Sequence, residues 1–169
     1  MSFDPAMNEK RSVQVLPLVT AILVTCAIAG IGRLLTELGP WYFALKKPWW
    51  QPPDWAFGPA WTVIFGFATA AAYKAWIATK DGLFRSKLVV LFLLNGALNV
   101  VWSWLFFTQR RPDWALVEVG FFWLSIVALI VLTGRRARTA AYLLVPYLAW
   151  VTFAAYLNQT VAALNAPFG

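Results

Sequence analysis

The stretch WALVEVGFFWLSIVALIVLT, residues 114–133, contains one charged side chain, Glu118. A helix needs about 20 mostly apolar residues to cross the hydrocarbon core of a membrane. This stretch is long enough, and it lacks the alternation of apolar and polar residues that marks a lipid-facing strand. We therefore predict a transmembrane helix here.

Four further runs of the same kind lie at residues 13–35, 57–77, 88–107 and 140–164. Open sheet edges cannot face lipid, so the five runs predict an all-α integral membrane protein. We expect a single domain over residues 1–169, built as a bundle of five transmembrane helices. The first two spans are joined by a long loop rich in Pro and Trp, whereas most of the other connections are short.

The composition excludes most other classes of protein. Apolar residues make up 61% of the chain and charged residues 12%, against about 25% charged residues in a soluble domain. The net charge of +7 comes from short clusters between the apolar runs, which does not favour nucleic-acid binding. With no histidine and one cysteine, we expect no metal site and no intrachain disulfide.

The basic residues also predict the orientation in the membrane. One side carries nine of them: Lys10, Arg11, Lys74, Lys80, Arg85, Lys87, Arg135, Arg136 and Arg138. The other side carries five: Arg33, Lys46, Lys47, Arg110 and Arg111. Under the positive-inside rule the N-terminus is cytoplasmic, and the long loop and the C-terminus lie on the opposite side.

Eleven tryptophans need an explanation in so short a chain. Indole rings prefer membrane interfaces, and this fits the rings nearest the predicted span ends: Trp76, Trp104 and Trp114. Three rings lie deeper and are better ligand candidates: Trp102, Trp123 and Trp150.

Polar residues inside the spans suggest where helices or a ligand are contacted. Asn95, Asn99 and Trp102 follow at intervals of four and three, so they share one helix face. We expect Asn95 to bond a neighbouring helix and Asn99 to contact a ligand. For Glu118 a structural pairing and a functional role are equally supported, and it stays outside the predicted site.

The expected depths of several of these residues in the membrane place them close together. Trp61 begins the second span, Asn99 and Trp102 lie in the same half of the third, and Trp150 lies near the middle of the fifth. All of them can meet beneath the long loop. A pocket of indole rings with one amide suits a flat, largely apolar ligand.

The order of motifs resembles a known family. The first loop reads Trp41-Tyr42, Lys47-Pro48-Trp49, Pro52-Pro53, Trp55 and Trp61, followed later by Asn95, Asn99, Phe106-Phe107, Pro146-Tyr147 and Trp150. From Trp41 to Asn158 this set closely resembles the tryptophan-rich sensory protein family (TspO/MBR), whose members are also called translocator proteins or peripheral-type benzodiazepine receptors.

The resemblance implies a five-helix bundle, usually a homodimer, with a pocket on the side of the first loop. Such pockets bind porphyrins, haem, sterols and synthetic ligands, and no cofactor is required. Carried over residue by residue, the implied ligand-binding positions are Tyr42, Trp61, Phe65, Asn99, Trp102, Trp150 and Ala154. For the dimer, the small residues Gly66 and Ala70 form one candidate contact face.

Three functions follow from the resemblance. The leading hypothesis is a membrane receptor or sensor for tetrapyrroles such as protoporphyrin IX or haem, with a role in porphyrin homeostasis or stress signalling. The second is an enzyme that degrades porphyrin in light and oxygen, with Trp61 and Trp150 as candidate electron-transfer residues; no conventional catalytic motif is present. The third, transport of tetrapyrroles or sterols, lacks an inverted repeat and a charged relay in the sequence.

Overall fold

The computed structural model describes the backbone of residues 5–168 and the side chains of residues 15–168. Its elements are α1 (Pro5–Leu35), α2 (Pro40–Ala44), α3 (Asp54–Ile77), α4 (Gly82–Ser103), the π-helical turn η1 (Trp104–Thr108), α5 (Pro112–Gly134) and α6 (Arg138–Asn165). Five helices are long and apolar enough to span a membrane, and the described residues form no strand. The predicted fold class is confirmed.

Several helices begin earlier than the apolar runs because polar and proline residues start them. The third span was expected from residue 88, yet α4 begins at Gly82. The carboxylate of Asp81 caps it by accepting a hydrogen bond from the Phe84 N–H at 3.1 Å. Similarly, α5 begins with Pro112, whose missing N–H costs nothing in a first helical turn.

The bundle is packed most tightly at the end where its connections are short. α5 and α6 are in extensive contact, α4 packs on α5, and α3 packs on α6. Ala71 and Ala75 of α3 and Ala140 of α6 are fully buried, so small residues let the backbones approach closely. Leu129 and Leu144 fill the space between α5 and α6 without any exposed surface.

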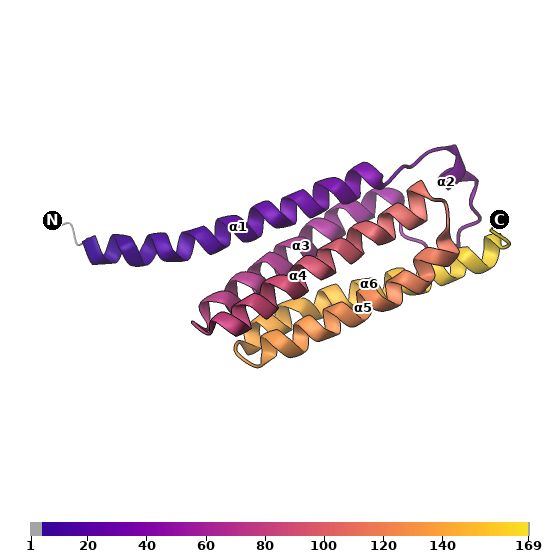
Figure 1. The fold of residues 1–169 in the computed structure, drawn as a ribbon. Helices are drawn as coiled ribbons and strands as arrows, with labels where there is room; N and C mark the ends of the chain where they lie inside the picture. The colour runs from indigo at the N-terminus through magenta and orange to yellow at the C-terminus, as the bar shows by residue number, and fades with distance from the viewer. Residues whose placement is uncertain (1–4, 169) are drawn as a thin grey trace.

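Helix α1 lies along the outside of the bundle against α3 and α4 (Figure 1). It is joined to α3 by a hydrogen bond of 2.9 Å between the hydroxyls of Thr69 and Thr25. It meets α4 at Gly96, where an added Cβ would lie 2.3 Å from Cδ1 of Ile28. A larger residue at Gly96 would therefore force the Ile28 side chain to move. The start of α1 and the end of α6 lie at opposite ends of the molecule.

A buried polar network links three helices near the middle of the bundle. The side-chain amide of Asn95 donates to the Ser125 hydroxyl at 2.8 Å, and the Tyr147 hydroxyl donates to the side-chain carbonyl of Asn95 at 3.0 Å. The Ser125 hydroxyl in turn donates to the Phe122 carbonyl at 2.7 Å. The predicted role of Asn95 in bonding neighbouring helices is confirmed.

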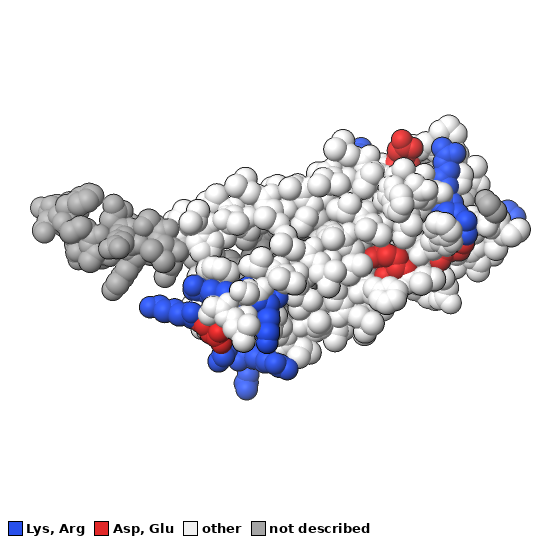
Figure 2. All heavy atoms as spheres, viewed as in Figure 1, with Lys and Arg blue, Asp and Glu red and all other residues white. Residues whose placement is uncertain are grey.

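Lysine and arginine gather at the two ends of the molecule, and few charges lie between them (Figure 2). At the short-loop end, Arg136 forms an ion pair with Asp81 at 3.3 Å. Lys10 and Arg11, which entered the prediction of orientation, have side chains outside the described residues. This distribution fits a chain that exposes its middle to lipid.

We predict that Asn95→Ala lowers the free energy of unfolding by about 1–2 kcal/mol, because it removes two side-chain hydrogen bonds between helices. Asn99→Ala serves as the control, since the Asn99 side chain makes no hydrogen bond to a described residue. Thermal unfolding followed by circular dichroism in detergent measures the difference. Equal melting temperatures for the two variants would contradict the structural role of Asn95.

Candidate ligand-binding cavity

The first loop crosses the open end of the bundle and contains the short helix α2 (Figure 1). Sequence analysis did not predict this helix, which starts at Pro40 and has only five residues. Tyr42 is the buried residue of α2, so α2 packs toward the bundle on the side of Tyr42. The loop is thus a folded cover rather than a linker.

Helix α6 holds this cover in place through two kinds of contact. The Asn165 amide donates to the Lys46 carbonyl at 2.9 Å, and the Asn165 carbonyl accepts from the Lys46 N–H at 2.9 Å. Trp50 stacks on Tyr156 with ring centroids 5.1 Å apart and an interplanar angle of 14°. Phe153 meets the edge of Trp50 at 6.0 Å. The loop is therefore fixed to the last turns of α6.

Beneath the loop lies a cavity of about 560 Å³. Its volume falls within the range of small-molecule sites, roughly 300–1,000 Å³. Residues of α1, the first loop, α3, α4, η1 and α6 line it. The lining includes all seven residues predicted as ligand-binding: Tyr42, Trp61, Phe65, Asn99, Trp102, Trp150 and Ala154.

Aromatic rings form the deeper wall of the cavity. Trp61 lies 5.3 Å from Phe65 and 6.4 Å from Trp150, measured between ring centroids, and the two indoles are nearly perpendicular at 86°. Phe57 meets Trp150 edge-on at 5.8 Å. Such contacts hold each ring in one orientation and leave faces for a flat ligand. The Trp150 N–H is buried and has no acceptor among the described residues.

Asn99 supplies a polar group to this wall. It is buried, and its side-chain amide makes no hydrogen bond to a described residue. Gly32 of α1 faces it, since an added Cβ there would lie 3.8 Å from the Asn99 carbonyl oxygen. Both the donor and the acceptor of this amide are therefore free for a ligand.

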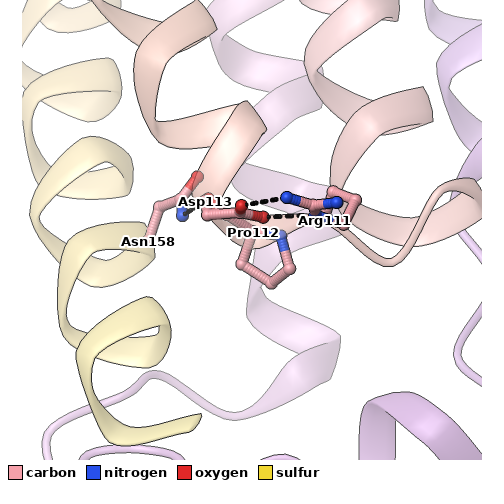
Figure 3. Close-up of polar contacts among 4 residues, drawn as sticks. All are labelled: Arg111, Pro112, Asp113 and Asn158. Carbon is pink, nitrogen blue, oxygen red and sulfur yellow. Dashed lines mark hydrogen bonds and ion pairs between the residues drawn. The ribbon is translucent and has the colours of Figure 1, made fainter. Parts of the chain in front are cut away.

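Asn158 is a lining residue that sequence analysis missed. Its side-chain carbonyl accepts from the Trp102 indole N–H at 3.1 Å. Its side-chain amide donates to the Pro112 carbonyl at 2.8 Å (Figure 3). Beside it, the Arg111 guanidinium holds the Asp113 carboxylate with two hydrogen bonds at the start of α5. Asn158 thus fixes Trp102 against α5 and α6.

Spacing could have revealed Asn158. Trp150, Ala154 and Asn158 follow at intervals of four, which places them on one face of α6. The predicted site stopped at Ala154. An amide on the next turn of a ligand-facing stripe is the signal that was available.

A polar cluster closes the cavity at the loop. The Tyr42 hydroxyl donates to the Asp54 carboxylate at 2.6 Å, and the Gln51 amide donates to both groups at 3.3 Å. Burial and the hydrogen bond to Asp54 raise the pKa of Tyr42, so its hydroxyl stays protonated at neutral pH. The Lys47 ammonium lies 3.5 Å from the centre of the Tyr42 ring. Sequence analysis had identified only Tyr42 in this cluster.

Two residues considered from the sequence do not line the cavity. The Trp123 indole, one of the deeper rings, donates to the Thr152 hydroxyl at 2.8 Å between α5 and α6. Glu118 is 8% exposed, and its carboxylate oxygens have no hydrogen-bond partner among the described residues. It lies outside the lining, as expected for a residue left off the site.

Comparison with known proteins gives consistent matches over most of the chain. A sequence model of the TspO/MBR family matches residues 19–164. The tryptophan-rich protein TspO of Chlorobaculum tepidum is 38% identical over 157 residues, covering 90% of this chain and 98% of the relative. The tryptophan-rich sensory protein of Cereibacter sphaeroides is 32% identical over 148 residues, covering 88% and 91%. The translocator protein of Homo sapiens is 38% identical over 125 residues, covering 72% of each chain.

We predict that Asn165→Ala loosens the first loop, because it removes both hydrogen bonds to the Lys46 backbone. Hydrogen–deuterium exchange in detergent should become faster at Lys46 and its neighbours and stay unchanged in α5. Gln159→Ala is the matched control on the same helix, since Gln159 is exposed. Unchanged exchange at Lys46 in the Asn165 variant would show that the loop is held by its aromatic contacts alone.

Proposed function

This chain belongs to the TspO/MBR family of membrane proteins, and we propose that it is a membrane receptor or sensor for tetrapyrroles such as protoporphyrin IX or haem. The observation that carries the proposal is the aromatic cavity beneath the first loop. Regulation of porphyrin levels or a stress response would follow from occupancy of this cavity.

The shape and chemistry of the cavity support a flat, largely apolar ligand. Trp61, Phe65 and Trp150 offer ring faces and edges on one wall. Trp102, which also lines the cavity, stacks on Phe106 with centroids 5.3 Å apart. Aromatic pairs contribute about 0.5–1.5 kcal/mol beyond the area they bury. A macrocycle in this cavity would gain from several rings at once.

Hydrogen bonds from the cavity would orient the bound ligand. Asn99 has a free amide at the cavity wall. The Tyr42 hydroxyl donates to Asp54 and accepts from the Gln51 amide at 3.3 Å, so a ligand that bonds Tyr42 would compete with these two partners. Trp102 is engaged through its N–H with Asn158, so only its ring is available for stacking. We assign hydrogen bonding to Asn99 and Tyr42 and stacking to the indoles.

An enzymatic role is the second candidate, favoured by the pairing of Trp61 and Trp150. Two indoles with centroids 6.4 Å apart line the same cavity, where they would lie beside a bound porphyrin. In a light-dependent oxidation of the macrocycle, the porphyrin loses electrons to oxygen, and indoles beside the photoexcited ring would take part in the electron transfer. Binding alone needs no such step, so the two functions differ in their products.

Orientation and assembly are part of the proposal. We propose a cytoplasmic N-terminus with the first loop on the opposite side, supported by the bias of nine basic residues to five. Gly66 faces open space on α3, with no atom within 4 Å of an added Cβ, and Ala70 follows one turn later. We propose a homodimer, with this small-residue face as one candidate for the contact.

We predict that Trp61→Ala and Trp150→Ala each weaken protoporphyrin IX binding by about two- to tenfold, because each removes a stacking partner. Quenching of tryptophan fluorescence in purified, detergent-solubilised protein measures the dissociation constant. Trp114→Ala is the control, because it also removes an indole but lies outside the cavity. Linear quenching that is identical in every variant would mean that the porphyrin partitions into detergent, and the proposal would fall.

Illumination separates receptor from enzyme. If the chain degrades porphyrin, light and air should generate a new absorption spectrum with the wild type that is lost in Trp61→Ala and Trp150→Ala. If it only binds, all proteins should show protection or the bleaching seen without protein. Because weaker binding alone also lowers turnover, the comparison is made at saturating porphyrin.

A further inference from the structure

The charged residues that line the cavity all lie at its loop end, and their summed charge is positive. Three charged residues line it: Arg33 at the end of α1, Lys47 in the first loop and Asp54 at the start of α3. The deeper wall is formed by rings and small side chains. The cavity therefore has a polar, net positive mouth above an apolar interior.

Asp54 does not form an ion pair with either cation. Its carboxylate accepts hydrogen bonds from Tyr42 and Gln51, which are neutral. Among the described residues, ion pairs occur only at Arg111–Asp113 and Arg136–Asp81. Both cations at the mouth therefore lack a carboxylate within 4 Å.

Lys47 is half-buried beside the cavity. Its nitrogen lies 3.5 Å from the centre of the Tyr42 ring and 5.3 Å from that of Phe43, contacts that stabilise an ammonium. Burial lowers the pKa of the side chain, and the negative charge of Asp54 opposes this lowering. The adjacent Lys46 is exposed and does not line the cavity. Of these two neighbouring lysines, Lys47 therefore lines the cavity and Lys46 is exposed at the surface.

Arg33 retains most of its hydrogen-bonding capacity. One guanidinium nitrogen donates to the Thr36 carbonyl at 3.3 Å, and the other N–H groups make no hydrogen bond to a described residue. Glu37, one turn further along, forms no ion pair with it. A guanidinium with free parallel donors is suited to bind a carboxylate through two hydrogen bonds.

We propose that Arg33 and Lys47 bind carboxylate groups of the ligand, so that the cavity selects planar apolar molecules with an anionic edge and orients that edge toward the first loop. This inference rests on the proposed tetrapyrrole function and specifies its ligand class. The two propionate groups of protoporphyrin IX would lie at the mouth, and the ring would lie against Trp61 and Trp150. Neutral flat molecules such as sterols lack this contact.

The test compares protoporphyrin IX with its dimethyl ester, which keeps the ring and removes both charges. Binding is measured by fluorescence quenching in nonionic detergent with wild type, Lys47→Gln and Arg33→Gln. Wild type should bind the acid about tenfold more tightly than the ester, since hydrogen bonds to charged groups are the stronger class. Each variant should weaken binding of the acid, leave binding of the ester unchanged and so reduce this ratio.

Lys46→Gln is the matched control, because it removes the same charge from the neighbouring residue, and it should keep the wild-type ratio. Equal binding of acid and ester by wild type would overturn the inference, as would an unchanged ratio in both cavity variants. If wild type binds the acid and the ester equally and saturably, the proposed function as a tetrapyrrole receptor still holds. If neither compound binds wild type saturably, the proposed function fails and this inference fails with it.

Discussion

Hydrocarbon offers no hydrogen bonds, and this constraint determines most of the structure. Each span satisfies its backbone as a helix, and the side-chain amides inside the bundle need partners of their own. Asn95 meets the constraint by joining α4 to α5 and α6. Asn158 meets it by joining the Trp102 indole to the first carbonyl of α5. Asn99, which lines the cavity, makes no side-chain hydrogen bond to a described residue.

The lengths of the connections decide where the bundle is solid and where it is hollow. Between Ile77 and Gly82, and between Gly134 and Arg138, only a few residues turn the chain, which draws the helix ends together. At the other end, the loop from Leu35 to Asp54 gives the helices room to separate and then folds over the space. Small residues close the first end, and aromatic rings frame the second.

The parts of the structure that were predictable depend on local pattern. Hydropathy located five spans because each must provide its own apolar surface, and helical spacing grouped Asn99 with Trp102. Ala154 was predicted only from the resemblance to the family. The π-helical turn and α2 were not predicted, since neither has a periodic signal over so few residues. The role of Asn158 arises from contacts between separate segments, the bond from Asn158 to Pro112 spanning 46 residues. The roles of Gln51 and Lys47 depend on how the first loop folds back on Tyr42, which has no periodic signal in the sequence.

The last turns of α6 both close the bundle and support the cover of its cavity. Because Asn165 bonds the first loop, and the two ends of the described chain lie at opposite ends of the bundle, the termini are not equivalent sites for attaching another protein. A reporter fused before α1 would sit far from the cavity and leave its mouth clear. A reporter fused after α6 would emerge beside the loop, where crowding or tension on the helix end would be transmitted directly to the cover.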